Sequence, residues 1–307
     1  MEHPVTLRNG TAVVVLSLLV AVVAGLLLFA RRRQARDFLD PKGPVFTGAG
    51  ARRTVATTAP PPRDRFSVVS FNVHFGYAAA DIAPTLRASR MDSADILLLQ
   101  ESNERTAREV AKDLGVAYVY YPATVHPTSN DLFGVAILSR WPITAHRKIL
   151  LPDHSYFDAA RKAAMTAVID LGGASIQVVN VHLQSGMLTH GYRAQLSRVL
   201  ACATRNACEG DAEPAALPPG NALVIGGDFN TWNRGLADVL TSLMSGASLQ
   251  RVEGIAGTFS KVPSETAPRS TFDYFFASPR LITGPGRVGT LRTGSDHFPI
   301  EATFQIR

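Results

Sequence analysis

The stretch Ala222-Leu-Val-Ile-Gly-Gly-Asp-Phe-Asn230 decides how this chain is interpreted. The apolar run from Ala222 to Ile225 predicts a short buried strand, and the two glycines after it allow a tight turn and a close approach to a ligand. Asp228 and Asn230 then follow at the carboxyl end of the strand. A carboxylate there can activate or orient a water molecule, and a neutral amide can donate a hydrogen bond to a phosphoryl oxygen. The alternative is that both are ordinary turn residues.

Four other predicted strands are flanked by polar residues of the same kind. These residues are Asn72 after Phe66–Phe71, Gln100-Glu101 after Ile96–Leu99, His182 after Ile176–Val181, and Ser295-Asp296-His297 near the C-terminus. Polar groups that gather at strand ends from distant parts of a sequence indicate one shared site.

Six motifs, in this order along the chain, resemble the endonuclease/exonuclease/phosphatase superfamily. They are Phe71-Asn72, Leu99-Gln100-Glu101, Asn180-Val-His182-Leu, Gly227-Asp-Phe-Asn230, Phe272-Asp273-Tyr274 and Ser295-Asp-His297-Phe-Pro-Ile300. Each motif alone is a weak signal, and the ordered set is specific. The resemblance implies a hydrolase of phosphate esters that uses Mg²⁺, with Mn²⁺ able to substitute.

The expected fold is α/β. Strands are predicted at Phe66–Phe71, Ile96–Leu99, Val135–Ser139, Ala164–Leu171, Ile176–Leu183, Ala222–Ile225, Phe272–Phe276 and Phe298–Gln305, and helices at Asp81–Ser89, Glu104–Leu114, Tyr192–Thr204 and Gly235–Met244. Asn103 is suited to begin the second helix and Gly115 to end it, and Gly172-Gly173 predicts a hairpin. Strands of mixed direction with helices outside fit two packed sheets. The resemblance implies a four-layer α/β/β/α sandwich of two mixed sheets, here preceded by one transmembrane helix.

Glu101 is the primary candidate for a metal ligand. It ends an apolar strand, where an unpaired carboxylate is costly, and a bound cation relieves that cost. Mg²⁺ fits because it prefers carboxylate, water and phosphate oxygens. The alternative is a salt bridge to a nearby arginine. The resemblance implies that Asn72 and Asp296 also serve the metal, directly or through water.

The remaining site residues follow from the resemblance. It implies that Asp273 holds His297 in its orientation and tautomer, and that water oriented by Asp228 attacks phosphorus in line with the leaving oxygen. Charge in such a transition state spreads over equatorial oxygens, so a metal and polar side chains stabilise it electrostatically. The side chains expected in this role are those of His182, Asn230 and His297. Arg161 is expected to contact a substrate phosphate, with a surface ion pair as the alternative.

Four segments divide the chain: a short flank at 1–10, a transmembrane helix at 11–30, a disordered linker at 31–65 and a catalytic domain at 66–307. Residues 11–30 carry no charge, and twenty helical residues span about 30 Å, the thickness of a bilayer core. The linker is basic and rich in Pro and Gly, which predicts a disordered tether.

The side of the membrane follows from the charges around the apolar run. Four arginines between Arg31 and Arg36 outweigh Arg8 on the other side, which places the catalytic domain in the cytoplasm by the positive-inside rule. The same arginine cluster is also suited to an anionic membrane surface. Cys202 and Cys208 leave an extracytoplasmic location open: they would be free thiols in the cytoplasm and a small disulfide in an oxidising compartment.

Charge also bears on the substrate. Residues 66–307 contain 21 basic and 21 acidic residues, and non-specific DNA binding depends on an excess of Lys and Arg. We therefore expect a membrane-tethered phosphodiesterase or phosphatase acting on a small or lipid-linked phosphate ester. A membrane-held nuclease of the same superfamily is the first alternative, and a non-catalytic binding module is a remote one.

Overall fold

A computed structural model describes most of the chain. The described residues are 13–26, 38–49, 64–76, 78–127, 129–152, 160–205, 208, 222–262 and 269–307. The predicted flank at 1–10 lies outside these residues, as do both ends of the predicted span 11–30.

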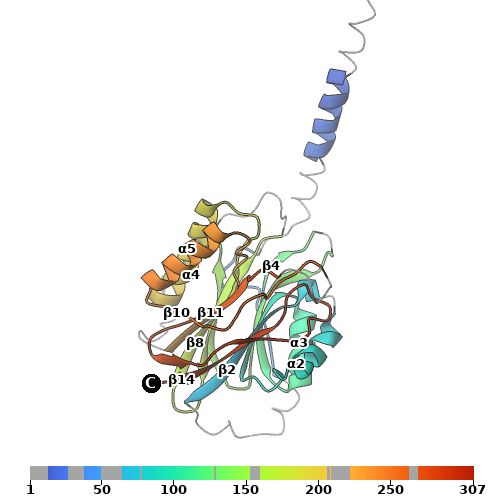
Figure 1. The fold of residues 1–307 in the computed structure, drawn as a ribbon. Helices are drawn as coiled ribbons and strands as arrows, with labels where there is room; N and C mark the ends of the chain where they lie inside the picture. The colour runs from blue at the N-terminus through green and yellow to red at the C-terminus, as the bar shows by residue number, and fades with distance from the viewer. Residues whose placement is uncertain are drawn as a thin grey trace, which may run out of the picture.

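Two mixed sheets pack face to face (Figure 1). Within the described residues, the first sheet has eight strands. Their order is β1 (Phe46–Gly48), β4 (Ala117–Val125), β5 (Leu132–Ser139), β3 (Ile96–Ser102), β2 (Arg65–Asn72), β14 (Ile300–Ile306) and β12 (Leu281–Thr283), and β13 (Arg287–Val288) also pairs with β14. The neighbours β2 and β3 are parallel, and the other pairs are antiparallel.

The second sheet has six strands among the described residues. Their order is β10 (Gln250–Arg251), β11 (Asp273–Ala277), β9 (Ala222–Asp228), β8 (Ser175–His182), β7 (Ala163–Asp170) and β6 (Ile143–Leu150). Only β8 and β9 run parallel in this part of the chain. Each sheet therefore has one central parallel pair, and the carboxyl ends of each pair meet at one edge.

Helices cover the outer face of each sheet (Figure 1). The helices α2 (Ala79–Ala88) and α3 (Glu104–Leu114) lie on the first sheet, and α4 (Thr189–Arg205) and α5 (Arg234–Gly246) lie on the second. One apolar core fills the space between the sheets, and two further cores lie under the helix pairs. The expected α/β/β/α arrangement is confirmed.

Capping and turn residues in the sequence correctly predicted both ends of α3 and the connection between β7 and β8. The side chain of Asn103 accepts a hydrogen bond from Thr106 N and begins α3, and Gly115 ends α3 in the left-handed region with φ of 68°. Gly172-Gly173 connects the antiparallel strands β7 and β8, as predicted. The strands β4 and β6 were not predicted. They are a paired strand beside β5 and an edge strand beside β7, respectively.

The prediction of a disordered linker at 31–65 is wrong for residues 38–49. Phe46–Gly48 forms β1, which pairs antiparallel with Tyr118–Tyr120 of β4. Backbone hydrogen bonds need no amphipathic pattern in the added strand, and the Pro and Gly content of this segment concealed it. The rest of the predicted linker, apart from 64 and 65, lies outside the described residues.

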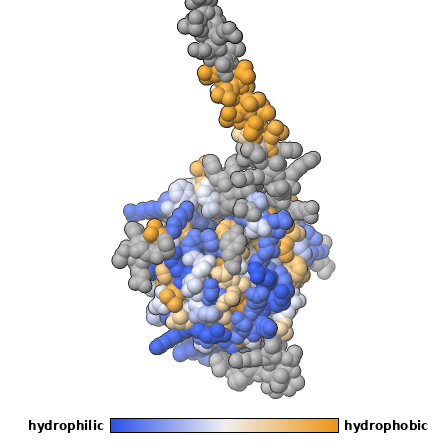
Figure 2. Space-filling model, turned by 90° about the vertical axis from the view of Figure 1, so that its right-hand side faces the viewer, coloured by the Kyte–Doolittle hydropathy of each residue, from blue (hydrophilic) through white to orange (hydrophobic). Residues whose placement is uncertain are grey.

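Residues 13–26 are helical and their side chains are exposed. Figure 2 shows this helix as an apolar surface beside a domain face on which hydrophilic residues predominate. In the described part of the chain, no helix has both the length and the apolar character needed to span a membrane.

A buried polar network joins the two sheets below the carboxyl ends of the parallel pairs. The Gln100 side chain donates to Asn180 Oδ1 at 2.7 Å, and the Asn180 amide donates to the carbonyls of Leu99 and Ala136 at 2.9 and 2.8 Å. Buried hydrogen bonds between side chains and carbonyls of facing strands favour one arrangement of the two sheets. The network therefore holds β8 against β3 and β5 just beneath the functional residues.

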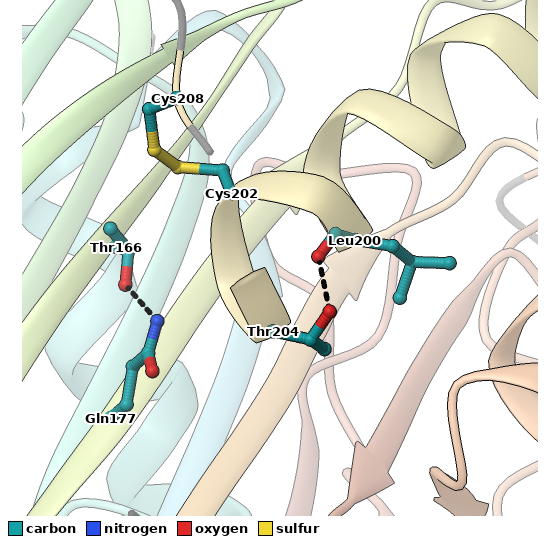
Figure 3. Close-up of a disulfide and its surroundings, with 6 residues drawn as sticks. All are labelled: Thr166, Gln177, Leu200, Cys202, Thr204 and Cys208. Atoms are coloured by element: carbon teal, nitrogen blue, oxygen red, sulfur yellow. Dashed lines mark hydrogen bonds between the residues drawn. A yellow bond between two sulfur atoms is a disulfide. The ribbon is translucent and has the colours of Figure 1, made fainter. Parts of the chain in front are cut away.

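The two cysteines of the sequence form a disulfide (Figure 3). Cys202 is buried in α4, and Cys208 packs against the core under α4 and α5.

Candidate active site

Functional side chains from four strands meet at one edge of the sandwich. Asn72 ends β2, Glu101 is near the end of β3, and His182 and Asp228 end β8 and β9, where they are register partners. Gly227 makes the close approach of β9 to β8 possible, since a Cβ on it would lie 2.0 Å from Val181 O. The two sheets face each other, so their four strand ends converge on one region.

Asp228 is the centre of this region. Its side chain is buried and accepts hydrogen bonds from Asn72 Nδ2 at 3.0 Å, from Asn230 N at 2.9 Å and from Asn230 Nδ2 at 3.3 Å. Burial raises the pKa of Asp228 to about 7, against the opposing effect of His297 and the amide donors. The Asn230 amide also donates to Leu183 O at 2.8 Å. Its two hydrogens thus hold the Asp228 carboxylate and the loop in this structure, and its hydrogen bond to a phosphoryl oxygen stays a prediction.

Asp273 and His297 form a buried pair beside Asp228. His297 Nδ1 lies 2.8 Å from Asp273 Oδ2, and His297 Nε2 lies 3.7 Å from Asp228 Oδ2. Burial opposes the charged imidazole, but Asp273 and Asp228 outweigh it and raise the pKa of His297 to about 10. His297 is therefore an imidazolium at neutral pH and is bonded to Asp273, the partner that the family resemblance implied.

Asp296 lies on the solvent side of this pair. Its Oδ1 is 3.2 Å from His74 Nδ1 and 4.0 Å from His297 Nε2. Burial opposes ionisation of Asp296, but the hydrogen bond to His74 and the charge of His297 outweigh it, so the pKa of Asp296 is lowered. The same hydrogen bond raises the pKa of His74.

Glu101 is aimed into the site by an irregular backbone. The pairing of β3 with β5 shifts register between Leu99 and Ser102, and Glu101 has a φ of 52°. Four of the seven non-glycine residues with positive φ in the described chain line the same pocket: His74, Phe75, Glu101 and Asn230. Such conformations are unfavourable and are typical of functional sites. Bulges often re-aim a side chain in this way.

His182 is fully buried, and neither of its ring nitrogens has a hydrogen-bond partner among the described residues. Its Nε2 lies 3.6 Å from Glu101 Oε1 and 3.7 Å from Asp228 Oδ2, which is too long for a hydrogen bond. Burial, together with the charges of Lys162 and His297, lowers the pKa of His182 well below its usual value. His182 is therefore neutral and has a free ring nitrogen beside two carboxylates.

A pocket of about 510 Å³ opens over these groups. It is lined by His74, Phe75, Glu101, Lys162, Ser185, Gly186, Asp228, Asn230, Trp232, Phe259, Lys261, Phe272, Asp296 and His297. Its acidic, imidazole and ammonium groups suit a phosphate ester with a cation, and the aromatic side chains on its walls suit an apolar part of a substrate.

Arg161 is not among the residues that line this pocket. Its Nη1 donates to Leu151 O, and the neighbouring Lys162 enters the pocket instead. Lys162 is buried, with Nζ 3.8 Å from Glu101 Oε1 and 4.4 Å from the centre of the Phe133 ring. The sequence signal for Lys162 was its place beside Arg161.

Two groups of residues are suited to hold a metal. Asp228, Asp273 and His297 offer ligand atoms within 4.8 Å of one another, but the Asp273–His297 bond already occupies His297 Nδ1. The second group is the predicted one, with Glu101 and Asp296 on the pocket wall and Asn72 bonded to Asp228. Its oxygen donors and strained, partly buried carboxylate fit a hard divalent cation.

Comparisons with known proteins show which proteins this chain is similar to. The chain is 29% identical to YbhP, an uncharacterised protein of Escherichia coli, over 192 residues that cover 55% of this chain and 68% of YbhP. A structure of D. rerio TDP2 with a single-strand DNA product matches with a TM-score of 0.58 and 19% identity, over 78% of this chain and 99% of that chain. A Staphylococcus aureus beta toxin mutant with bound magnesium ions matches with a TM-score of 0.53 and 17% identity, over 77% and 98%.

A family model for the endonuclease/exonuclease/phosphatase family matches residues 69–297. The matched segment contains all nine predicted site residues. Because it spans well over half of the 307 residues, the chain belongs to the endonuclease/exonuclease/phosphatase family.

Proposed function

We propose that this protein is a membrane-tethered, Mg²⁺-dependent hydrolase of phosphate esters. The family acts on phosphoric esters. The observation that carries the proposal is the convergence in one pocket of a charged His297 and the carboxylates of Glu101, Asp228 and Asp296. A neutral, buried His182 lies 3.6 Å from Glu101 Oε1 and 3.7 Å from Asp228 Oδ2. These groups combine an acceptor for a water proton with donors for a phosphoryl group.

Glu101 and Asp296 would hold Mg²⁺, with Asn72 at its side, and Mn²⁺ would fit the same oxygen donors. When bound, the cation supplies positive charge to the phosphoryl oxygens and the leaving group. The structural-neighbour toxin was solved with magnesium ions, which supports this choice.

Asp228 is suited to orient the attacking water and to accept its proton. The donors Asn72 and Asn230 hold the carboxylate in place, and a pKa near 7 matches the task of a general base. His182 Nε2 and His297 Nε2 each lie 3.7 Å from Asp228 Oδ2. The N–H groups of these two histidines and the Lys162 ammonium can donate to the phosphoryl oxygens as negative charge builds up. Asp273 keeps His297 charged and in position.

The substrate we favour is a small or lipid-linked phosphate ester. The formal neutrality of residues 66–307 supports it against the nuclease alternative. A nuclease remains the second candidate, because the neighbour TDP2 was solved with single-stranded DNA. The presence of Glu101, Asp228 and Asp296 in one pocket, with Asn72 bonded to Asp228, disfavours a non-catalytic binding module.

Turnover by the full chain should depend on a divalent cation. We expect EDTA to abolish hydrolysis of bis-p-nitrophenyl phosphate and either Mg²⁺ or Mn²⁺ to restore it, because the three carboxylates repel the phosphate without a cation. The assay is extended to p-nitrophenyl phosphate, sphingomyelin, phosphoinositides, RNA and plasmid DNA. Hydrolysis that resists the chelator would remove the metal from the proposal, and salt-sensitive plasmid cleavage as the dominant activity would establish the nuclease.

Lys162→Met should lower kcat/KM by about 10- to 100-fold, because a charged hydrogen bond to a bound anion contributes about 1.5–3 kcal/mol. Arg161→Met is the matched control, since its side chain leaves the pocket and activity should change less than about threefold. Lys162→Arg should recover part of the loss. A stronger effect at Arg161 than at Lys162 would indicate that Arg161 is the residue that contacts the phosphate.

We further propose that residues 11–30 anchor the protein in a membrane, supported by their lack of charge and by the helix at 13–26. For the side of the membrane we propose the extracytoplasmic one. The arginines after residue 30 favour the cytoplasm, but the Cys202–Cys208 disulfide is typical of oxidising compartments.

Cells lysed in denaturant with N-ethylmaleimide should therefore yield Cys202 and Cys208 unalkylated, because a disulfide cannot react with the reagent. Reduction before alkylation is the control and should label both cysteines. Mass spectrometry of the tryptic peptides measures the outcome. Two alkylated cysteines without reduction would return the catalytic domain to the cytoplasm.

A further inference from the structure

The segment at 38–49, here called the strap, contains β1, which is an edge strand of the first sheet and pairs with β4. Phe38 N donates to Ala123 O at 3.0 Å, and Phe46–Gly48 pairs with Tyr118–Tyr120. The strap thus runs antiparallel to β4, with Phe38 near the carboxyl end of that strand.

A buried lysine fixes the strap at its first residues. Lys148 on β6 is 1% exposed, and its Nζ donates to Phe38 O at 2.9 Å, to Gly43 O at 3.0 Å and to Pro122 O at 3.3 Å. Three carbonyl acceptors satisfy the three hydrogens of the ammonium group. Burial lowers the pKa of Lys148 to about 8. Through Lys148, the strap carbonyls of Phe38 and Gly43 are connected to β6 of the second sheet and to Pro122 on β4 of the first.

The strap begins at the same edge of the sandwich as the active site. The strand β4 is parallel to β3, because both are antiparallel to β5, so its carboxyl end lies with that of Glu101. His126, just after β4, packs edge-on against Phe75 with ring centres 4.6 Å apart, and Phe75 lines the pocket. Phe38, the first described residue of the strap, therefore lies at the active-site edge.

Only residues 31–37 separate Phe38 from the apolar run that ends at Ala30. Eight residue steps span at most about 29 Å even when fully extended. Anchoring of 11–30 in a membrane would therefore keep the active-site edge within this distance of the lipid surface.

Exposed apolar side chains gather around the pocket mouth. Four of the seven large ones that the structure places outside the helix at 13–26 lie on loops at this edge: Leu188, Trp232, Val262 and Leu291, here called the apolar rim. They are 83, 52, 54 and 45% exposed. Trp232 lines the pocket, and Leu291 lines an adjoining one of about 780 Å³. Leu188 and Val262 follow the pocket residues Gly186 and Lys261.

Single exposed apolar residues are normal, but several around one opening indicate an interaction surface. Two cations lie among them, Lys261 and Arg292, which both line the adjoining pocket. Apolar side chains mixed with Lys and Arg suit the interface of an anionic bilayer.

Together, these observations lead us to propose that the active-site edge docks on the membrane. The apolar rim enters the lipid interface, and the strap sets the orientation. This inference rests on the proposed phosphate-ester hydrolysis and narrows its substrate to a phosphate ester carried by a lipid of the same membrane.

The sequence offers a direct probe, because it has two tryptophans, one in the rim and one, Trp141, in the core. The full chain is reconstituted into vesicles of phosphatidylcholine and phosphatidylglycerol, with and without dibrominated acyl chains. We expect the brominated lipid to quench Trp232. The difference between the wild type and Trp232→Phe isolates this signal, and the buried Trp141 stays in place.

The double variant Leu188→Ser/Val262→Ser should lose most of the quenching and at least tenfold of its activity on lipid phosphate esters in the same vesicles. Its hydrolysis of bis-p-nitrophenyl phosphate should stay within about twofold, since neither residue lines the pocket. The matched control is Ile282→Ser, an exposed apolar residue on β12 outside both pockets. It should retain both properties.

The results of these experiments distinguish the docking proposal from the proposed hydrolysis of phosphate esters. Hydrolysis of the soluble ester without quenching of Trp232 overturns the docking and leaves the proposed function standing. Quenching without hydrolysis of any ester supports the docking and overturns the proposed function. Plasmid DNA as the preferred substrate, with no effect of the rim variant on any rate, overturns the lipid substrate.

Discussion

Asp228→Asn is expected to lower kcat by about 10³-fold, within the 10²- to 10⁴-fold range typical of a lost general base. The substitution keeps the shape of the side chain but removes its capacity to accept a proton from water. The fold should survive, because burial penalises the original charge and the remaining amide oxygen can still accept the hydrogen bonds that Asn72 and Asn230 donate to Oδ2. Steady-state kinetics with a soluble diester measure the loss, and thermal unfolding checks the fold.

The matched control is Asp113→Asn, at an exposed carboxylate on α3. It should leave kcat unchanged. If Asp228→Asn retained more than a tenth of the wild-type kcat, Asp228 would not be the base.

The pH dependence of kcat/KM tests the same residue from another direction. Asp228 must be ionised to accept a proton, so activity should rise with pH up to its pKa of about 7, or to a lower value where a bound cation favours the carboxylate. His297 must be protonated to donate, so activity should fall as pH rises through its pKa of about 10. The acidic limb should be absent from Asp228→Asn.

Much of the site could be predicted from the sequence because several of its polar residues lie at the ends of predicted strands. Asn72, Glu101, His182 and Asp228 each follow an apolar run, and the parallel pairs bring those ends together. The Asp273–His297 pair depended on the family resemblance, since 24 residues separate the two in the chain. The cap residues of α3 were visible because they act within one turn.

The missed features all depend on distant partners. Arg161 and Lys162 are adjacent and both basic, so only the packing of β7 decides which one enters the pocket. The strap has no amphipathic pattern and is held by backbone pairing with β4 and by Lys148, which is more than 100 residues away. The neutral state of His182 results from burial and from two cations that fold against it.

Glu101→Gln should remove nearly all metal-dependent activity, by about 10³-fold, because a metal centre contributes several kcal/mol to transition-state stabilisation. The substitution should also remove the stabilisation of the folded state by bound magnesium. Magnesium at 100 times its Kd stabilises a folded site by about 2.7 kcal/mol, equivalent to about 5–10 °C in Tm for a domain of this size. We expect this shift in the wild type and little of it in the variant.

Without metal, we expect Glu101→Gln to be at least as stable as the wild type. Glu101 is partly buried and adopts a left-handed backbone conformation beside Asp228, with Lys162 3.8 Å away as a partial counter-charge. Removing its charge relieves repulsion among the pocket carboxylates, so the Tm of Glu101→Gln in EDTA should equal or exceed that of the wild type. Glu253→Gln, at an exposed carboxylate, is the control and should follow the wild type in both conditions. An equal magnesium shift in Glu101→Gln and the wild type would move the cation to the Asp228, Asp273 and His297 group, the other set of donors in this pocket.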